Sequence, residues 1–406
     1  MDERSRSMNS RVPLRRLTTM TYGDALPDAL RRSGDVPVIS SGGVTGLHDK
    51  ENTRTPAIVI GRKGSHGSTW WSERAAFVID TAYYVDERNT NLDLRWLYYV
   101  MQSADLSALT NDVGVPGLSR ELAYKALVPA PPNSNEQRRI ADFLDDQVTR
   151  IDNIIAARQQ QAHLILERWR ETRRLVIRGL DRSAPADDAG GWLGPLAAGF
   201  QPRRIGSLAR VYAGAGFPID DQGVEAGEYP YMKVSDLAAA DARAEVRSSR
   251  NFVDRETARR LGAKPAPPET IVFPKVGAAL LTNRRAILAV EAVFDNNVMG
   301  LHFFGAHPRF MLHVLRDLDL ALVSNPGPVP SVNESTIKDI RVPVPGHHRQ
   351  ESITRRLDEE SADMEMVLRV LETAIVLLQE LKRSLISAAV SGEFDVSTAS
   401  GRGVPE

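Results

Sequence analysis

The feature that most constrains this chain is an internal repeat. Residues 136–180 align without a gap with residues 350–394, 214 positions later, in a chain of 406 residues. Identity between the two blocks is thin, but both combine a charged or apolar start, a long helical pattern and a glycine near the end. Upstream, residues 128–131 (VPAP) line up with residues 342–345 (VPVP) at the same offset. We therefore expect one structural plan to be built twice.

Bulk composition limits the class of protein. A length of 406 residues predicts two or more domains, each with its own core. The formal net charge of -1 gives no global basic field, so any nucleic-acid contact has to come from local patches. The absence of cysteine excludes disulfides, thiolate metal sites and cysteine catalysis. With no long apolar run and no signal-peptide pattern, we expect a soluble, cytoplasmic protein.

Two segments have the pattern of long helices. Residues 136–177 contain neither proline nor glycine, and their apolar residues recur three or four positions apart. The second segment, which starts near residue 350, has an almost strict heptad. A narrow apolar stripe on a long polar helix predicts a coiled-coil seam. The predicted seam consists of Ile140, Leu144, Ile151, Ile155 and Leu166 in the first helix and Leu357, Val367, Leu371, Leu378 and Leu385 in the second.

The rest of the chain has a mixed α and β pattern. Short apolar strands such as residues 36–40, 57–61 and 75–85 alternate with turns rich in glycine, serine and asparagine. The predicted fold class is α+β: two mixed domains separated by two long helices, which form an intramolecular antiparallel coiled coil with a pseudo-twofold repeat. The predicted boundaries are 1–134 and 201–346 for the mixed domains, 135–180 and 347–395 for the helices, 181–200 for a linker and 396–406 for a flexible tail.

Three stretches resemble the specificity subunits of type I restriction–modification systems. They are residues 57–85, with AIVIGRKGSHGSTWW at their start, residues 127–145, LVPAPPNSNEQRRIADFLD, and residues 381–396, LKRSLISAAVSGEFDV. Val-Pro-x-Pro followed by Glu-Gln-x-x-Ile and a long helix, all repeated once, is a specific combination. The second copy departs from it, with Gly346-His347-His348 in place of Pro132-Asn133-Ser134 and Gln350-Glu351 in place of Glu136-Gln137.

The resemblance implies a division of labour. Each mixed domain is a target-recognition domain for one half of a split sequence in double-stranded DNA, and the helices set the gap between the two halves. The helices also bind two methyltransferase (M) subunits, which use S-adenosylmethionine to methylate adenine, and restriction (R) subunits can join this core. The specificity subunit itself binds no cofactor or metal and catalyses no reaction. The host is implied to be bacterial or archaeal.

Candidate DNA contacts in the first half follow the strand at 57–61. Cations can bind phosphates or guanine edges, and glycines allow the backbone to approach DNA closely. An ordinary solvated hairpin turn is the alternative interpretation. The turn at residues 40–43 follows an equivalent strand and is a weaker candidate. The predicted contacts of this half are Ser40, Ser41, Arg62, Lys63, Ser65, His66 and Ser68.

The second half offers corresponding residues. An asparagine can pair with adenine, and arginines with guanine or phosphate; a solvated basic turn remains the alternative. The predicted contacts are Lys233, Ser235, Lys275, Asn283, Arg284 and Arg285. The basic end of the first helix, with Arg168, Arg170, Arg173 and Arg174, is either a solvated face or a phosphate contact.

Two other classes of function remain as alternatives. One is a coiled-coil scaffold whose mixed domains bind proteins, and the other is an enzyme with nuclease or methyltransferase activity. The sequence has no glycine-rich methyl-donor loop after a strand, no Asn-Pro-Pro-Tyr-like motif and no histidine spacing typical of zinc sites. These absences favour a non-catalytic, DNA-recognising subunit.

Overall fold

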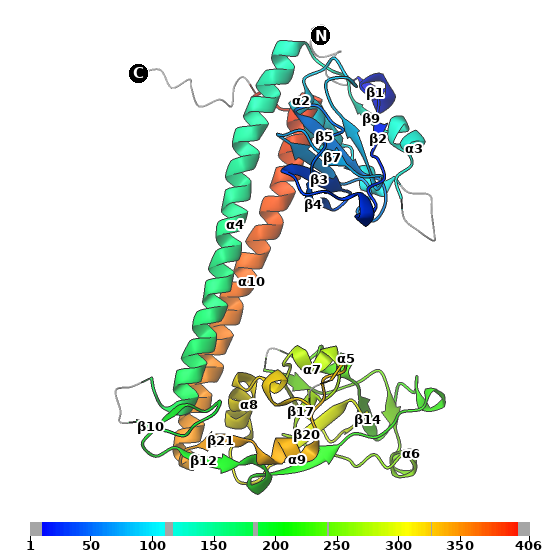
Figure 1. Ribbon diagram of the computed structural model, residues 1–406. Coiled ribbons are helices and arrows are strands. Elements are labelled where there is room, and N and C mark those ends of the chain that lie inside the picture. Colours follow the sequence, from blue (N-terminus) through cyan, green and yellow to red (C-terminus); the bar gives the residue numbers. More distant parts are fainter. Residues whose placement is uncertain (1–9, 110–116, 182–185, 242, 326, 397–406) are drawn as a thin grey trace. The chain divides into compact units, whose positions relative to one another are not determined.

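The structure, a computed structural model (Figure 1), describes residues 10–109, 117–181, 186–241, 243–325 and 327–396. The chain divides into two compact units. Unit 1 consists of Met1–Gln159 and Thr373–Glu406, and unit 2 of Gln160–Glu372. Each unit combines one mixed α and β part with half of each long helix.

The described part of unit 1 contains three sheets, and the largest of them is fully antiparallel. Its inner strand β5 (Ala57–Gly61) is buried along all five residues, which explains its unbroken apolar run AIVIG. The four-stranded sheet has the order β2 (Thr21–Tyr22), β8 (Ala82–Val85), β5 (Ala57–Gly61), β6 (Thr69–Ser72). The other sheets are β4 (Gly43–His48), β3 (Val36–Ser40), β7 (Phe77–Val78), and the pair β1 (Arg11–Pro13), β9 (Leu127–Pro129).

Helix α2 (Leu94–Ser103) covers the core of unit 1. Asp93 begins it as the N-cap, because its carboxylate accepts a hydrogen bond from the Trp96 amide at 2.9 Å. The face of α2 with Trp96, Leu97 and Val100 is buried in the same cluster as residues of β5, β8 and the long helices. Unit 1 also contains α3 (Arg120–Lys125) and the short 3-10 helices η1 (Leu14–Arg16), η2 (Asp28–Leu30) and η3 (Leu106–Ala108).

Unit 2 has the same plan. Three of its sheets correspond to those of unit 1. The largest has the order β13 (Ala209–Ala213), β20 (Val298–Phe303), β17 (Ile271–Pro274), β18 (Ala286–Leu288), β15 (Glu245–Val246). The other two are β16 (Phe252–Val253), β14 (Tyr229–Met232), β19 (Val293–Phe294), and the pair β12 (Gln201–Arg204), β21 (Arg341–Val344). Its shorter helices are α5 (Val234–Leu237), α6 (Arg255–Arg260), α7 (Ala278–Leu281), α8 (Pro308–Asp317), α9 (Glu334–Asp339), η4 (Ile205–Ser207), η5 (Ile219–Asp221) and η6 (Leu320–Val323).

Strand pairing shows how closely the two units correspond. β3 pairs in parallel with β7, and β14 pairs in parallel with β19, each within a three-stranded sheet. β5 pairs with β8, and β17 pairs in the same antiparallel sense with β20. Even a single connecting hydrogen bond is repeated: the Leu14 amide donates to Ala126 O, and the Ile205 amide donates to Ile340 O, both at 2.9 Å. The internal repeat is therefore a repeat of topology.

The long helices are α4 (Ser134–Arg178) and α10 (His347–Ser391), each of 45 residues. Both end at a glycine with positive φ, Gly179 at 73° and Gly392 at 76°, where a left-handed residue stops the helix. The first residues of the two helices lie 213 positions apart (347 minus 134), and so do the glycines that follow them (392 minus 179). The offset of 214 that the sequence alignment gives for the helices is therefore one too large. The turn that precedes α10 is one residue shorter than the turn before α4. Asn133 caps α4, because its side-chain oxygen accepts a hydrogen bond from the Glu136 amide at 3.0 Å.

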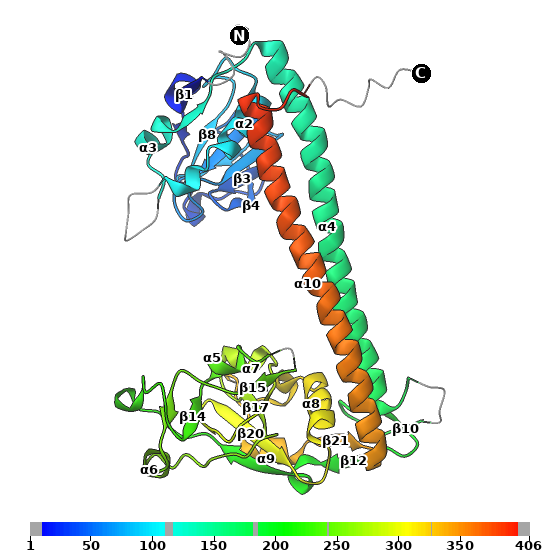
Figure 2. The ribbon, with the colours of Figure 1, turned by 180° about the vertical axis from the view of Figure 1, so that it is seen from behind.

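Halves of α4 and α10 run side by side in opposite directions within each unit (Figures 1 and 2). In unit 1 the buried residues Ile140 and Leu144 of α4 share a cluster with Ile386 and Ala389 of α10, and Lys382 pairs with Asp152 at 2.7 Å. In unit 2 the end of α4 meets the start of α10 in one cluster that contains Val176, Ile177, Ile353 and Leu357. The predicted antiparallel pairing is confirmed.

The predicted seam agrees with the structure at nine of its ten positions. Ile140, Leu144, Ile151, Ile155, Leu357 and Leu371 are buried, while Leu166, Leu378 and Leu385 are half-buried. The prediction for Val367 is wrong, because 41% of this residue is exposed. Adjacent residues of a helix point about 100° apart, and the next residue, Leu368, is the half-buried one. The stripe thus runs from Leu357 through Met364 and Leu368 to Leu371.

Residues 181–200, predicted as a linker, contain an ordered hairpin in their described part. β10 (Ala186–Asp188) pairs with β11 (Pro195–Ala197), and Leu193, Leu196 and Phe200 are buried in the unit 2 core. Arg178, the last residue of α4, donates hydrogen bonds to Leu193 O at 2.6 Å and Trp192 O at 3.0 Å. The apolar residues between the glycines explain the order, because they complete the core around the end of α4. Of the predicted tail 396–406, only Val396 lies within the described residues.

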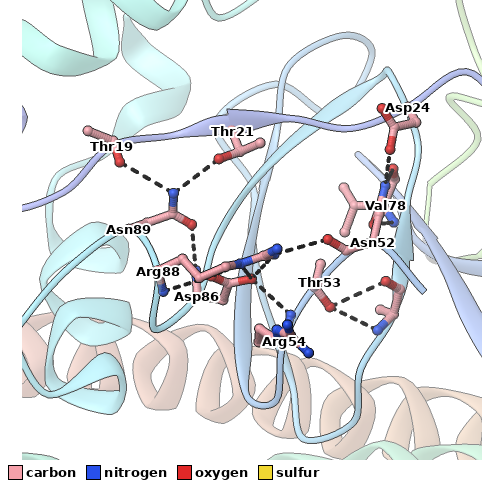
Figure 3. A network of polar contacts seen from close by, with 11 residues as sticks. Thr19, Thr21, Asp24, Asn52, Thr53, Arg54, Val78, Asp86, Arg88 and Asn89 are labelled. Carbon is pink, nitrogen blue, oxygen red and sulfur yellow. Dashed lines mark hydrogen bonds and ion pairs between the residues drawn. The ribbon is translucent and has the colours of Figure 1, made fainter.

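A polar network fixes the edge of the unit 1 sheets (Figure 3). The buried Asp86 carboxylate accepts from the Arg88 side chain and from the Arg54 amide at 2.8 Å. Asn89 donates from its amide to Thr19 Oγ1 at 3.3 Å and Thr21 Oγ1 at 3.1 Å. Burial raises the pKa of Asp86, but hydrogen bonds from Arg88 and the backbone outweigh it and hold that pKa below its usual value. The network positions Thr21 in β2, and with it the neighbouring residue Tyr22.

Candidate nucleic-acid interface

A tight loop of unit 1 connects β5 to β6 and contains most of the predicted contacts. Gly61 donates to Ser68 O at 2.8 Å, and Gly67 donates to Gly61 O at 2.9 Å, which closes the loop. A Cβ on Gly67 would lie 2.2 Å from Ser107 N, and its φ is +76°, so this position requires glycine. The loop is therefore held in one conformation, with Lys63 and Ser65 exposed.

His66 and Ser68 have local partners. The two ring nitrogens of His66 lie 3.2 Å from Gly64 O and 3.1 Å from Ser107 O. Ser68 Oγ lies 2.7 Å from both Ser65 O and Ser41 O, and its single proton can be donated to either carbonyl. These contacts favour a role in fixing the loop over direct contact with a ligand.

The turn at residues 40–43 packs against the same loop. Ser41 is buried, and its carbonyl accepts from Ser68 and from Trp70 Nε1 at 3.1 Å. Ser40 closes the turn with its hydroxyl, which accepts from the Gly42 amide at 3.1 Å and donates to Gly43 O at 3.2 Å. The structure thus brings all seven contacts predicted for the first half into one region.

Arg62 belongs to a cluster that the sequence did not reveal. Its guanidinium lies 5.1 Å from the centre of the Tyr22 ring, and the guanidinium of Arg120 lies 4.8 Å from the same ring. Tyr22 is 42% exposed, and its ring also contacts that of the buried Tyr83 edge-on at 5.0 Å. Two cations against one exposed aromatic ring make a surface suited to phosphates and base edges. We call Tyr22, Arg62 and Arg120 the tyrosine–arginine cluster.

One signal in the sequence could have pointed to Arg120. Residues 116–119 (PGLS) and 330–333 (PSVN) are equivalent stretches of sequence in the two halves, and Pro116 lies outside the described residues. In the structure Leu118 donates to Arg62 O at 2.8 Å, so the turn that precedes Arg120 is tied directly to the loop after β5. Burial raises the pKa of Tyr83, whose hydroxyl donates to Leu118 O, to about 12. It therefore stays neutral beside the two arginines.

In unit 2 Lys275 takes the place of Arg62. The Lys275 amide donates to Asn297 O at 2.8 Å, and Lys275 O accepts from the Val332 amide at 2.9 Å, as Arg62 does with Thr81 and Leu118. Gly277 has φ +71°, close to the +72° of Gly64. Lys275 thus begins the equivalent loop, but here the loop continues into helix α7.

Asn283 and Arg285 have a placement that disagrees with their predicted role. The Asn283 amide donates to Leu318 O at 3.0 Å and accepts from Arg285 at 2.9 Å, so it is used within the fold. Arg285 is buried and also donates to Arg284 O at 2.9 Å. Asn283 has φ +53°, which asparagine tolerates better than most residues. Both residues hold the turn, and Arg284 between them is exposed.

Lys233 and Ser235 lie at the start of α5, after β14. The Lys233 ammonium donates to Gln222 Oε1 at 2.6 Å and lies 5.1 Å from the Phe217 ring, which stacks on Tyr231 at 3.7 Å. The parallel pairings of β14 and β3 put Lys233 at the position of Ser40. The predicted contacts of unit 2 therefore do not form one cluster: Lys233 and Ser235 adjoin β14, whereas Arg284 lies beyond α7.

These surfaces combine cationic, hydroxyl and aromatic groups. Among the residues that the structure describes, no group of three or more His, Cys, Asp or Glu could hold a metal ion. Within the same residues, no helix is long and apolar enough to cross a membrane. What the surfaces offer is guanidinium and ammonium groups, hydroxyls and an exposed aromatic ring.

Comparison with known proteins identifies the first half of the chain. Residues 20–163 match the family model of the type I restriction modification DNA specificity domain. Residues 20–163 form a type I specificity domain. This match covers β2, the loop after β5, α2, α3 and the first part of α4, and so includes the whole tyrosine–arginine cluster. The resemblance to type I specificity subunits is confirmed.

A curated relative agrees with this assignment. The chain is 27% identical over 116 residues to the type I restriction enzyme EcoBI specificity subunit of Escherichia coli. The aligned part makes up 28% of this chain and 24% of that relative, so it spans about a quarter of the relative's length.

A solved structure has a similar fold over nearly the whole length of the chain. A structure from work on complex assembly and conformational transition of the type I R-M system matches with a TM-score of 0.64 at 13% identity, over 95% of this chain and 98% of that one. It shows a shared fold, including both mixed parts and both long helices. A type I S subunit from M. genitalium matches at 16% identity over 94% and 96% of the two chains, with a TM-score of 0.41.

Proposed function

We propose that the chain is the DNA-recognition subunit of a type I restriction–modification complex. It directs adenine N6 methylation or cleavage to a bipartite target in double-stranded DNA, and each unit contacts one half-site. The observation that carries the proposal is the specificity domain at residues 20–163, combined with a second unit of the same topology. Two recognition folds in one chain suit a target with two halves.

The proposed contacts of unit 1 centre on the tyrosine–arginine cluster and Lys63. Arg62 and Lys63 lie in the loop after β5, and Arg120 lies at the start of α3. The glycines of the loop fix its conformation. A rigid loop sacrifices little conformational entropy on binding. In unit 2 we assign the corresponding role to Lys275 and Arg284, and separately to Lys233 and Ser235 at the end of β14.

The partners we propose are two methyltransferase (M) subunits, bound along the long helices. Apolar side chains remain exposed there in both units. They are Ile154, Val376, Leu377 and Leu381 in unit 1, and Leu164, Met366, Val367 and Val370 in unit 2. Exposed apolar residues at spacings of three and four on a helix favour a protein partner. Restriction (R) subunits would join the complex through the M subunits.

Catalysis is assigned to the partners in this proposal. S-adenosylmethionine binds to the M subunits, and the chain supplies neither a cofactor site nor catalytic groups. The complex acts in the cytoplasm of a bacterium or archaeon, where host DNA is its substrate.

The proposal is tested by mapping methylated adenines in a host that expresses the chain with its M partner. We expect one split motif, which disappears when the chain is omitted. Replacing Arg62 and Arg120 with Ala should change the motif in one half only, whereas Lys275→Ala with Arg284→Ala should change the other. Methylation that needs the chain but shows no split motif would contradict the proposal, and so would methyl transfer by the isolated chain.

A further inference from the structure

Unit 2 contains a hollow of about 680 Å³ with an unusual excess of arginine. It lies where the last turns of α4 meet the turn after α7. Its lining includes Arg170, Arg173 and Arg174 from the helix and Arg284 and Arg285 from the turn. We call it the arginine hollow. The basic helix end and the basic turn, which are over 100 residues apart in sequence, therefore face a single space.

The carboxylates at the hollow are already engaged. Asp317 pairs with Arg178 at 3.0 Å and with Arg174 at 3.5 Å. Asp319 accepts from the Ala321 amide at 2.9 Å as the cap of η6. Among the described residues, neither Arg170 nor Arg284 has an acidic partner within 4 Å in the structure. The positive charge of the hollow is thus only partly balanced by the protein.

Two of the arginines are also removed from water. Arg285 is buried, and desolvation lowers its pKa to about 9. Desolvation likewise lowers the pKa of Arg173 to about 10. Arg173 donates to Arg316 O at 3.1 Å, but its buried Nε has no hydrogen-bond partner among the described residues. Asp317 offsets part of the charge of Arg173 and Asp319 part of that of Arg285, although neither forms an ion pair with these arginines within 4 Å among the described residues. Both arginines remain charged at neutral pH, and a buried charge that is only partly compensated is costly, which favours the binding of an anion.

The repeat provides an internal comparison. An offset of 213 residues between the long helices places Arg383, Ile386 and Ser387 of α10 where unit 2 has Arg170, Arg173 and Arg174 of α4. These residues line a hollow of about 570 Å³ in unit 1, together with Gln102, Ser103 and Asp105. Its other cation, Lys382, pairs with Asp152 at 2.7 Å. The same place in the fold is therefore strongly basic in one unit and close to neutral in the other.

We propose that the arginine hollow is a phosphate-binding site, present in unit 2 and absent from the equivalent place in unit 1. Guanidinium groups bind phosphate oxygens through paired N–H donors. The phosphate of a DNA backbone is the favoured source, because the exposed Arg284 adjoins the hollow and lies on the loop that corresponds to the DNA-facing loop of unit 1. A free phosphate compound offers the same chemistry. The DNA source rests on the proposed function, but the site itself does not.

The first experiment measures binding of labelled duplex DNA by the full chain as a function of salt. For Arg170→Ala with Arg284→Ala, we expect weaker binding and a salt dependence of log K that is shallower by about 0.9 for each DNA phosphate that the protein no longer neutralises. Arg383→Ala is the matched control and should leave the slope unchanged. Arg170→Lys with Arg284→Lys keeps the charges and should retain most of the slope.

The second experiment uses tripolyphosphate, without DNA, and follows thermal unfolding. Tripolyphosphate should raise the midpoint of the unmodified chain and of Arg383→Ala, but not that of Arg170→Ala with Arg284→Ala. If the double variant shows no such rise while its DNA binding is unchanged, the phosphate site stands and its ligand is a free phosphate compound. If the double variant matches the unmodified chain in both experiments, the proposal is overturned, whether or not the chain binds DNA.

Discussion

Gln137 and Gln350 make the same two hydrogen bonds in their respective units. Each donates from its side-chain amide to a proline carbonyl five residues earlier, Pro132 at 2.7 Å and Pro345 at 2.8 Å. Each accepts at Oε1 from the amide that begins the adjacent helix, Asp93 at 2.9 Å and His307 at 2.7 Å. The glutamine thereby ties the start of a long helix to the N-cap of α2 or α8.

We expect Gln137→Ala and Gln350→Ala each to lower the free energy of unfolding by about 1–3 kcal/mol, because a buried amide and a buried carbonyl are left without partners. The midpoint of urea unfolding measures this. Gln159→Ala, on the exposed face of α4, is the control and should change stability by less than about 0.5 kcal/mol. Equal effects for all three variants would refute the anchoring role.

Two substitutions in α10 test the position of the coiled-coil seam. Leu357→Asp buries a charge in the unit 2 core and should cost several kcal/mol. Val367→Asp places its charge in solvent and should leave folding nearly unchanged. The same variant should weaken binding of an M subunit if the exposed apolar face is a docking surface. Co-purification with the M subunit, alongside unfolding midpoints, would separate these effects, and severe unfolding of Val367→Asp would contradict the observed register.

Arg120→Ala should weaken DNA binding, because it removes one of the two cations over Tyr22. A base contact should relax specificity at one position by about 1–3 kcal/mol, whereas a phosphate contact should lower affinity for all sequences. Competition binding with duplexes that vary in one half-site distinguishes the two. The unfolding midpoint of Arg120→Ala, which should stay close to that of the unmodified chain, controls for impaired folding. Unchanged binding after Arg120→Ala would remove this residue from the interface.

His313 makes the stability of unit 2 dependent on pH. Burial lowers its pKa, and this outweighs the opposing effect of Asp358, whose Oδ1 lies 2.8 Å from His313 Nε2. The unfolded chain therefore binds more protons than the folded one as pH falls below about 6.5, the ordinary pKa of histidine. We expect the free energy of unfolding to decrease as pH falls through this range. His313→Gln should remove that part of the pH dependence, and an identical pH profile would contradict the assignment.

The spacing between half-sites should follow the length of the helices. Adding four residues near Gln159 and four near Ala374 lengthens each helix by about 6 Å and rotates its ends by about 40°. We predict the same two half-sequences with a spacer longer by about one or two base pairs. Mapping methylated adenines measures the spacer. An unchanged spacer would show that the helices bind partners without setting the gap.

The repeat, the long helices and the loop after β5 could be predicted, because hydrophobic periodicity and glycine placement are local signals. The exact offset between the two repeats was harder to predict. The Val-Pro-x-Pro motifs align at an offset of 214 residues, whereas α4 and α10 align at 213. The equivalent hydrogen bonds of Gln137 and Gln350 show that the missing residue lies in the turn before α10. Val367 was misplaced because Val367 and Leu368 are both apolar and lie three and four residues after Met364, so spacing alone does not show which of them faces the partner helix.

The tyrosine–arginine cluster could not be predicted, because Tyr22 and Arg120 are distant in sequence and meet only through the packing of β2 against α3. Arg285 illustrates a different limit. Sequence shows that a cation is present, but not that its guanidinium turns inward to the carbonyl of Leu318. Residue type indicates what a side chain can bind, whereas burial decides what it meets.

The division of the chain has a consequence for its synthesis. Unit 2 is continuous in sequence, but unit 1 needs residues from both ends of the chain. Because domains fold as units during synthesis, unit 2 can complete its core while Ile140 and Leu144 still lack Ile386 and Ala389. On the ribosome, the domain translated first is thus the one finished last, and until then its half of α4 exposes an apolar stripe that other chains or chaperones can bind.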